Sequence, residues 1–191
     1  MVQAIFEPDG LLSRVLTQHQ TRTGQIQMAV AVAQALTMKQ PLVVEAGTGV
    51  GKTFAYLVPA LLSGQRVLVS TATKTLQDQL FSRDIPELLQ ALGLPLRLAM
   101  LKGRGSYLCQ QRLELAHPAA TLHDRTAVRS LAQVQTWSRT PTTGDLAEVP
   151  SLDERSALIP LITSNRDNCL GSTCPHWREC HVNTARREAI A

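Results

Sequence analysis

The chain has 191 residues, of which 44% are hydrophobic and 18% are charged, and this composition predicts a globular protein with one sizeable core and room for a smaller lobe. The formal net charge of +4 permits a nucleic-acid partner without requiring one. No apolar stretch is long enough to span a bilayer, and Glu7 and Asp9 argue against a secretory signal. We therefore expect a cytoplasmic protein with no membrane partner.

The first hundred residues alternate between helical and strand patterns. Apolar residues recur at helical spacing in three segments that we predict as helices: Gln25–Met38, Lys52–Leu62 and Lys74–Phe81. Short apolar runs predict three strands: Pro41–Glu45, Arg66–Ser70 and Leu94–Leu101. Strands and helices alternating at this spacing predict an α/β fold, in which crossover helices connect the strands of a parallel sheet.

The pattern changes after Leu101. The following region predicts three helices separated by polar and proline-containing stretches: Tyr107–Leu115, Thr121–Trp137 and Asp153–Ile162. Thr140–Pro150 is expected to be a loop. We place a domain boundary near Lys102–Cys109, with residues 1–105 forming the first lobe and residues 106–191 forming a mostly helical insertion on it.

A glycine-rich loop lies between the first predicted strand and the helix that follows it. Its residues are Ala46, Gly47, Thr48, Gly49, Val50, Gly51, Lys52 and Thr53, which match G-x-x-x-x-G-K-[ST] with alanine in place of the first glycine. Glycines let backbone amides curl around a triphosphate, and the helix that follows points the positive end of its dipole at the anion. We expect Lys52 to reach the β- and γ-phosphates and Thr53 to bind Mg²⁺. The alternative is a glycine-rich turn without a ligand.

Four cysteines form a second candidate site. Cys109 is isolated in sequence, whereas Cys169, Cys174 and Cys180 form a C-x4-C-x5-C group. Four thiolates suit either Zn²⁺ or an iron–sulfur cluster, and the alternative is four unrelated core cysteines. Structural zinc sites usually use two closely spaced pairs, so this spacing favours the larger cluster.

Four stretches of sequence together resemble the XPD/DinG-like iron–sulfur helicases of superfamily 2, and most closely their bacterial DinG branch. They are R-T-G-Q-I-Q-M at 22–28, E-A-G-T-G-V-G-K-T at 45–53, S-T-A-T-K-T-L-Q-D-Q-L at 70–80, and K-G-R-G-S-Y-L-C at 102–109 followed by the cysteine group. The resemblance runs through nearly the whole chain in the order of the family. It implies a RecA-like P-loop NTPase lobe with a glutamine motif, Walker A and motif Ia, carrying a helical iron–sulfur insertion.

The resemblance also implies roles for individual residues. Gln25 with Arg22 would recognise the adenine of ATP, and the four cysteines would hold a [4Fe–4S] cluster. The residues implied to contact single-stranded DNA are Ser70, Thr71, Thr73, Lys74, Lys102, Arg104 and Tyr107. Simpler structural roles remain open for them, because Thr73 also suits a helix cap and Tyr107 also suits a packed core. His117, His123, His176 and His181 are not expected to be ligands.

The resemblance implies an ATP-dependent DNA helicase that moves 5′ to 3′ on single-stranded DNA and acts on forked or overhang duplexes in repair or replication. We find no D-E-x-H box, and the terminal R-R-E-A-I-A predicts the middle of a helix. We therefore expect an N-terminal fragment that hydrolyses no ATP alone. Two rivals remain open: another P-loop NTPase with a zinc lobe, and a redox-sensing or scaffold module that binds ATP without turnover.

Overall fold

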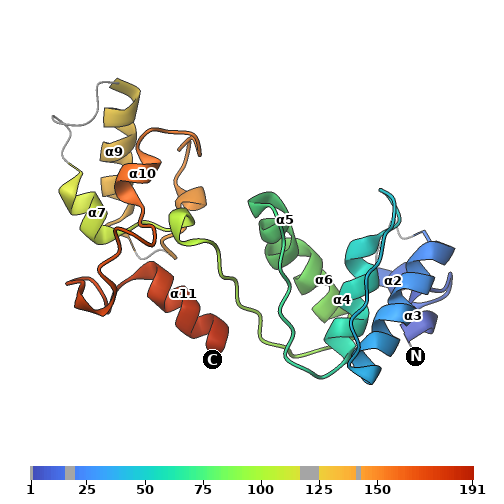
Figure 1. Ribbon diagram of the computed structural model, residues 1–191. Coiled ribbons are helices and arrows are strands. Elements are labelled where there is room, and N and C mark those ends of the chain that lie inside the picture. Colours follow the sequence, from blue (N-terminus) through green and yellow to red (C-terminus); the bar gives the residue numbers. More distant parts are fainter. Residues whose placement is uncertain (1, 16–19, 117–124, 141–142) are drawn as a thin grey trace. The chain divides into compact units, whose positions relative to one another are not determined.

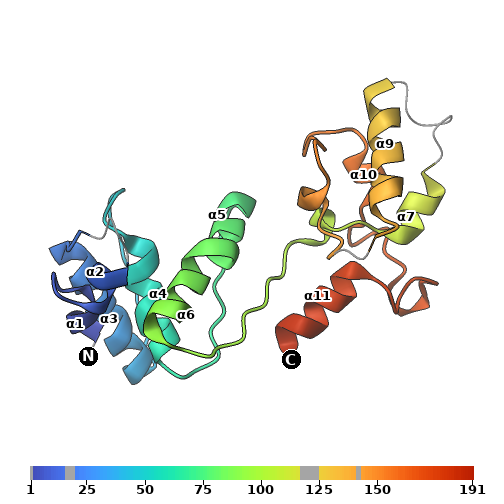
Figure 2. The same cartoon turned by 180° about the vertical axis from the view of Figure 1, so that it is seen from behind.

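The computed structural model describes residues 2–15, 20–116, 125–140 and 143–191. The chain divides into two compact units, Met1–Leu98 and Ala99–Ala191, each with a core of its own. Figures 1 and 2 show both units as assemblies of helices. Among the described residues, no helix has the length and apolar content needed to cross a bilayer.

Helices account for most of the regular structure in the first unit. They are α1 (Val2–Phe6), α2 (Leu11–Val15), α3 (Thr23–Met38), α4 (Lys52–Leu62), α5 (Lys74–Gln79), the π-helical turn η1 (Leu80–Asp84) and α6 (Ile85–Leu92). The helices predicted at Gln25–Met38 and Lys52–Leu62 are confirmed. The helix predicted at Lys74–Phe81 begins where expected, but it widens into the π-helical turn after Gln79.

The core of the first unit forms where α3, α4 and α6 turn apolar residues towards one another. Its buried side chains are Phe6, Leu12, Ala29, Ala55, Leu57, Val58, Leu80, Ile85 and Leu88. Each fully buried Leu, Val or Phe side chain stabilises the fold by roughly 1.5–3 kcal/mol relative to an exposed one. This core anchors α4, and α4 in turn begins at the phosphate loop.

The three predicted strands are not formed in the described residues. Segments 41–45, 66–70 and 94–101 contain no strand, and the side chains of Val43 and Leu68 are 96% and 93% exposed. The physical reason is that a strand exists only when another segment accepts its backbone hydrogen bonds, whereas a helix closes its bonds within four residues. Local composition favours these segments as strands, but it cannot supply the partners.

The second unit contains short helices joined by loops. They are η2 (Arg104–Ser106), α7 (Gln110–Leu115), α9 (Arg125–Trp137), η3 (Leu146–Glu148), α10 (Ile159–Ile162), η4 (Gly171–Thr173) and α11 (His181–Ile190). The core side chains are Leu108, Leu113, Leu131, Val134, Leu146, Val149, Leu158 and Ile162. Tyr107 packs in a smaller cluster with Val182 and Ala185 of α11.

The predicted helices of this unit are present but shorter. The helix expected at Tyr107–Leu115 begins at Gln110. The helix expected at Thr121–Trp137 is α9, and its first four predicted residues lie outside the described part. The helix expected at Asp153–Ile162 shrinks to α10, where proline occupies the first turn, the helical position that tolerates it best. The loop expected at Thr140–Pro150 includes the short helix η3, and residues 141–142 of that loop are not described.

Candidate functional site

The phosphate loop meets α4 at Gly51, and this position requires glycine for two reasons. Gly49 and Gly51 have φ angles of 80° and 83°, in the left-handed region that side chains disfavour. A Cβ atom at Gly51 would also lie 2.2 Å from Nε2 of Gln25. Glycine is therefore needed at this position both for the backbone conformation of the loop and for the close approach of α3.

The ammonium group of Lys52 lies inside the curl of the loop. Its Nζ donates hydrogen bonds to the carbonyl oxygens of Ala46, at 2.9 Å, and Gly47, at 2.7 Å. Thr53 occupies the next position, in the first turn of α4, and its side chain hydrogen-bonds to Tyr56. The pKa of Tyr56 is raised, mainly by burial and secondarily by the charge of Asp84, while the bond to Thr53 opposes the shift.

Gln25 brings α3 against the phosphate loop. Its residue is 2% exposed, and its Nε2 donates to the carbonyl oxygen of Gly51 at 3.0 Å. The other amide atom, Oε1, is buried without a hydrogen-bond partner among the described residues. An unsatisfied buried acceptor costs about 1–3 kcal/mol, and an adenine amino group is a donor that would satisfy it. Arg22, the predicted companion of Gln25, is exposed at the residue before α3.

The segment predicted to grip DNA lies around the start of α5. Ser70, Thr73 and Lys74 are exposed, and Thr71 is half-buried. Thr73 caps α5, because its Oγ1 accepts a hydrogen bond from the backbone N–H of Leu76 at 3.3 Å. Thr71 donates from its hydroxyl to the carbonyl oxygen of Thr73 at 3.2 Å. The local hydrogen bonds therefore fix the shape of this turn and leave the Ser70 and Lys74 side chains at the surface.

Lys102 and Tyr107, predicted as DNA contacts, lie instead in the interior of the second unit. The side chain of Lys102 is 1% exposed and forms an ion pair with Asp145. The phenol oxygen of Tyr107 accepts a hydrogen bond from the backbone N–H of Lys102 at 3.0 Å, and the residue is 4% exposed. Neither side chain reaches the surface, so the predicted DNA contacts of these two residues do not fit this structure. Sequence reasoning missed Asp145, because no spacing pattern links it to Lys102.

The four cysteines are all free and half-buried in the second unit. The pKa of Cys109 is raised, first by burial and also by the charges of the other three sulfurs, while the backbone N–H of Arg112 acts in the opposite direction. The other three thiols therefore each lie within electrostatic reach of Cys109. No three ligand side chains in the described residues are close enough to hold a single metal ion.

Two hydrogen-bond donors contact the sulfur of Cys169. Arg104, the third predicted DNA contact, donates from Nη1 to the Sγ of Cys169 at 2.7 Å, and the backbone N–H of Gly171 donates to the same sulfur at 3.4 Å. Cys109 and Cys180 are the residues that precede α7 and α11.

Two of the four histidines that we do not expect to be ligands, His176 and His181, lie within the described residues. His176 contacts Oε2 of Glu114 through Nε2 at 3.0 Å, and burial lowers the pKa of His181. His117 and His123 lie outside the described residues.

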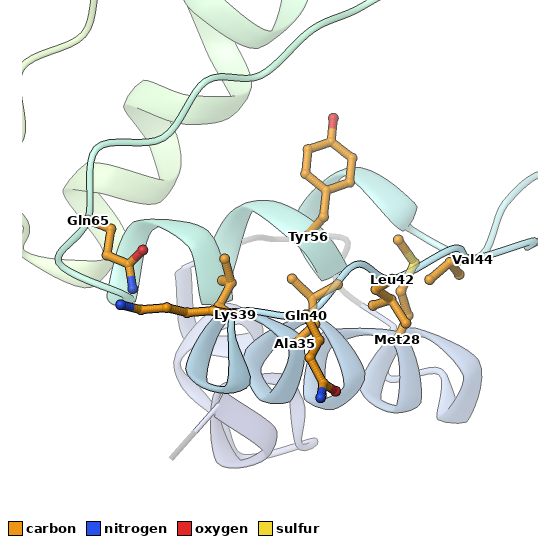
Figure 3. Close-up of a pocket in the computed structure, with 10 residues that line it drawn as sticks. Met28, Ala35, Lys39, Gln40, Leu42, Val44, Tyr56 and Gln65 are labelled. Atoms are coloured by element: carbon orange, nitrogen blue, oxygen red, sulfur yellow. The ribbon is translucent and has the colours of Figure 1, made fainter.

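A separate cavity of about 540 Å³ lies between α3, α4 and the segment that joins them. Figure 3 shows Met28, Leu42 and Val44 along this cavity, with Tyr56 projecting from α4. Of the predicted site residues, only Thr53 is connected to the cavity lining, through its hydrogen bond to Tyr56. The cavity is therefore distinct from the phosphate loop.

Comparison with known proteins identifies a family model that matches this chain and relatives that are similar to it. A family model described as DEAD/DEAH box helicase matches residues 25–136. The chain is 44% identical over 186 residues to the ATP-dependent DNA helicase YoaA of Haemophilus influenzae and 46% identical over 185 residues to that of Escherichia coli, covering 97% of this chain and 29% of each relative. It is 38% identical over 191 residues to the ATP-dependent helicase DinG of Mycobacterium tuberculosis, covering 88% of this chain and 28% of that protein. The chain thus spans less than a third of the length of these relatives.

Proposed function

We propose that this chain, which belongs to the DEAD/DEAH box helicase family, forms the nucleotide-binding part of an ATP-dependent DNA helicase. Its relatives YoaA and DinG are named as ATP-dependent helicases. The proposed activity couples hydrolysis of ATP to movement along single-stranded DNA and separation of duplexes. By the resemblance, movement runs 5′ to 3′, the substrates are forked or overhang duplexes in repair or replication, and the location is cytoplasmic.

The observation that supports the proposal most directly is the arrangement around Gly51. The Lys52 ammonium lies in the curl of the loop, and the buried Oε1 of Gln25 lacks a partner beside the same turn. A triphosphate at the start of α4 would draw Lys52 from the loop carbonyls to its phosphate oxygens. An adenine amino group is a donor of the kind that the Gln25 acceptor lacks.

Thr53 completes the proposed phosphate site. Its hydroxyl is the expected ligand of Mg²⁺, and Tyr56 holds the Thr53 side chain by a hydrogen bond. When bound, Mg²⁺ neutralises charge on the phosphates. The protein contributes the Lys52 charge, the backbone amides of the loop and the dipole of α4.

The proposed DNA segment is the turn from Ser70 to Lys74. The exposed Ser70 hydroxyl and Lys74 ammonium are suited to phosphate oxygens, whereas Thr71 and Thr73 hold the turn in shape. Segments 41–45, 66–70 and 94–101 would be strands of a parallel RecA-like sheet once partner strands accept their hydrogen bonds. The exposure of Val43 and Leu68 supports this, because pairing and packing would cover them.

Residues 106–191 form the proposed iron–sulfur lobe, and residues 1–105 the first part of the motor domain. The support is a set of four thiols in the same unit, all free and half-buried: Cys109, Cys169, Cys174 and Cys180. A [4Fe–4S] cluster bound by these cysteines would cross-link them and would supply a centre that accepts one electron.

The experiment that tests the proposal is Lys52→Ala in the full-length protein. We expect loss of DNA-stimulated ATP hydrolysis and of duplex unwinding, because the mutation removes the cation that binds the phosphates. Arg97→Ala is the matched control, since it removes an exposed cation of the same unit that is not part of the loop sequence. Unwinding by Lys52→Ala at the rate of the control would refute the assignment.

A further inference from the structure

Asp84 is a charged residue in the interior of the first unit. It lies at the end of the π-helical turn η1, and the residue is 4% exposed. Its Oδ2 accepts a hydrogen bond from Nε2 of Gln79 at 2.8 Å, and its Oδ1 accepts one from Nε of Arg83 at 2.9 Å. π-helical turns occur frequently at functional sites. The fold therefore holds a carboxylate at a place where an apolar side chain would pack at lower cost.

Tyr56, which projects from α4 in Figure 3, interacts both with the phosphate-loop end of that helix and with Asp84. It follows Thr53 by three residues, so the two side chains share one face of α4, and they form a hydrogen bond. Tyr56 packs against the core cluster that contains Leu80 and Ile85, the first residues of η1 and α6. Burial, and secondarily the charge of Asp84, raise the pKa of Tyr56, so the phenol stays protonated.

A continuous helix connects Asp84 to the proposed DNA segment. Thr73 caps α5, and α5 runs directly into η1. The hydrogen bonds from Gln79 and Arg83 fix the carboxylate to this helix. Because a helix moves as a rigid element, a displacement of the turn from Ser70 to Lys74 would be transmitted to Asp84.

We propose that Tyr56 is a positioning residue that couples the DNA segment to the nucleotide site, because it holds the Thr53 side chain and responds to the position of Asp84. This inference rests on the proposed function, which takes the loop as the phosphate site and the turn at 70–74 as the DNA segment. The Thr53 hydroxyl has one proton to donate. A bond in which the phenol oxygen accepts that proton leaves the Thr53 lone pairs for the nucleotide site. A displaced Asp84 changes the field at the phenol and hence the strength of this bond.

The test measures how much single-stranded DNA changes the affinity of the full-length protein for a non-hydrolysable ATP analogue. The analogue is titrated calorimetrically with and without a saturating oligonucleotide, and the ratio of the two affinities is the coupling factor. The variant is Tyr56→Phe, which removes the hydroxyl and keeps the ring. Ser63→Ala is the matched control, since it removes a hydroxyl at the other end of α4, where Ser63 bonds to the backbone of Ala60 and Gln65.

We expect a coupling factor of about 5 to 150 in the unchanged protein and in Ser63→Ala, the usual range for two linked sites. Tyr56→Phe should bind the analogue nearly as well without DNA and lose most of the increase that DNA causes. A role in folding alone would weaken both affinities equally and leave the coupling factor unchanged. Asp84→Asn keeps an acceptor for Gln79 and removes the charge, so it should lower the coupling factor as well. The double variant should lower it no further than the stronger single variant, because both changes interrupt the same connection.

The results that would overturn the inference differ from the result that would overturn the proposed function. Equal coupling factors in Tyr56→Phe, Ser63→Ala and the unchanged protein would remove the role of Tyr56 and leave the nucleotide site in place. An unchanged protein that binds the analogue equally well with and without DNA would do the same, since there would be no coupling to transmit. An unchanged protein that does not bind the analogue at all would remove the proposed function and the inference together.

Discussion

At the scale of single residues, Gly51 is the position where the phosphate loop tolerates least change. We predict that Gly51→Ala abolishes nucleotide binding, because the added carbon meets Gln25 and moves the loop out of register with α4. The control is Gly64→Ala, since Gly64 also has a positive φ, of 67°, but open space around the added carbon. Both variants should lose roughly 1–2 kcal/mol of stability from backbone strain. Titration with a fluorescent ATP analogue should separate them, and equal affinities would contradict the steric argument.

The buried pair of Lys102 and Asp145 makes a second prediction at this scale. Lys102→Met leaves the Asp145 charge without its partner in the interior, which should lower the free energy of unfolding by about 3–5 kcal/mol. The double variant Lys102→Met with Asp145→Leu should recover much of that loss, because it removes both charges. Denaturant unfolding measures each value. A double variant no more stable than the single one would show that the pair is not the source of the effect.

The curl of the phosphate loop could be predicted from the sequence, but the surroundings of individual side chains could not. Gly51 and Lys52 occur in a contiguous motif whose geometry follows from local backbone rules. The burial of Lys102 depends on Asp145, and the contact of Arg104 depends on Cys169. Both partners are distant in sequence. When such partners are unknown, a cation near an aromatic residue in the sequence predicts a contact with DNA as readily as a contact inside the protein.

At the scale of elements, α5 tests whether Thr73 is structural or also functional. Thr73→Ala removes the helix cap and should cost about 0.5–2 kcal/mol of stability. Thr75→Ala is the control, because Thr75 is exposed inside the same helix and alanine is a better helix former there. We expect Thr73→Ala to weaken binding of single-stranded DNA only as far as the turn loosens, whereas Lys74→Ala should weaken it and reduce its salt dependence. Unchanged salt dependence in Lys74→Ala would exclude a phosphate contact.

The helices could be predicted from the sequence and the strands could not, because helix signals are local whereas strand pairing depends on segments distant in sequence. The bounds of α4 follow from sequence alone, because apolar spacing and the loop before it are local signals. Segments 41–45 and 66–70 have strand composition, yet their hydrogen bonds require partners that local patterns do not identify. The π-helical turn after Gln79 was also unpredictable. Asp84, at its end, is buried and accepts from Gln79 at 2.8 Å and from Arg83 at 2.9 Å, contacts that no periodicity encodes.

At the scale of the whole molecule, the two units should respond differently to loss of metal. We predict that anaerobic removal of iron increases amide hydrogen exchange in the core of the second unit, at Leu131 and Val134. The reason is that the proposed cluster cross-links the cysteines of this unit, and its removal allows local unfolding. Exchange at Leu57 and Val58 in the first unit should not change, since each unit has its own core. An equal increase of amide hydrogen exchange in both units would contradict a metal cross-link that stabilises only the second unit.

The measurement that tests the central claim most directly is calorimetric titration of Mg–ATP into the purified protein and into its Lys52→Ala variant. We predict saturable binding of one nucleotide by the unchanged protein and at least tenfold weaker binding by the variant, a loss of about 1.4 kcal/mol or more. A dissociation constant of roughly 1 mM corresponds to a binding free energy of about −4 kcal/mol. If the unchanged protein shows no saturation up to this nucleotide concentration, that result would contradict a phosphate site at the start of α4.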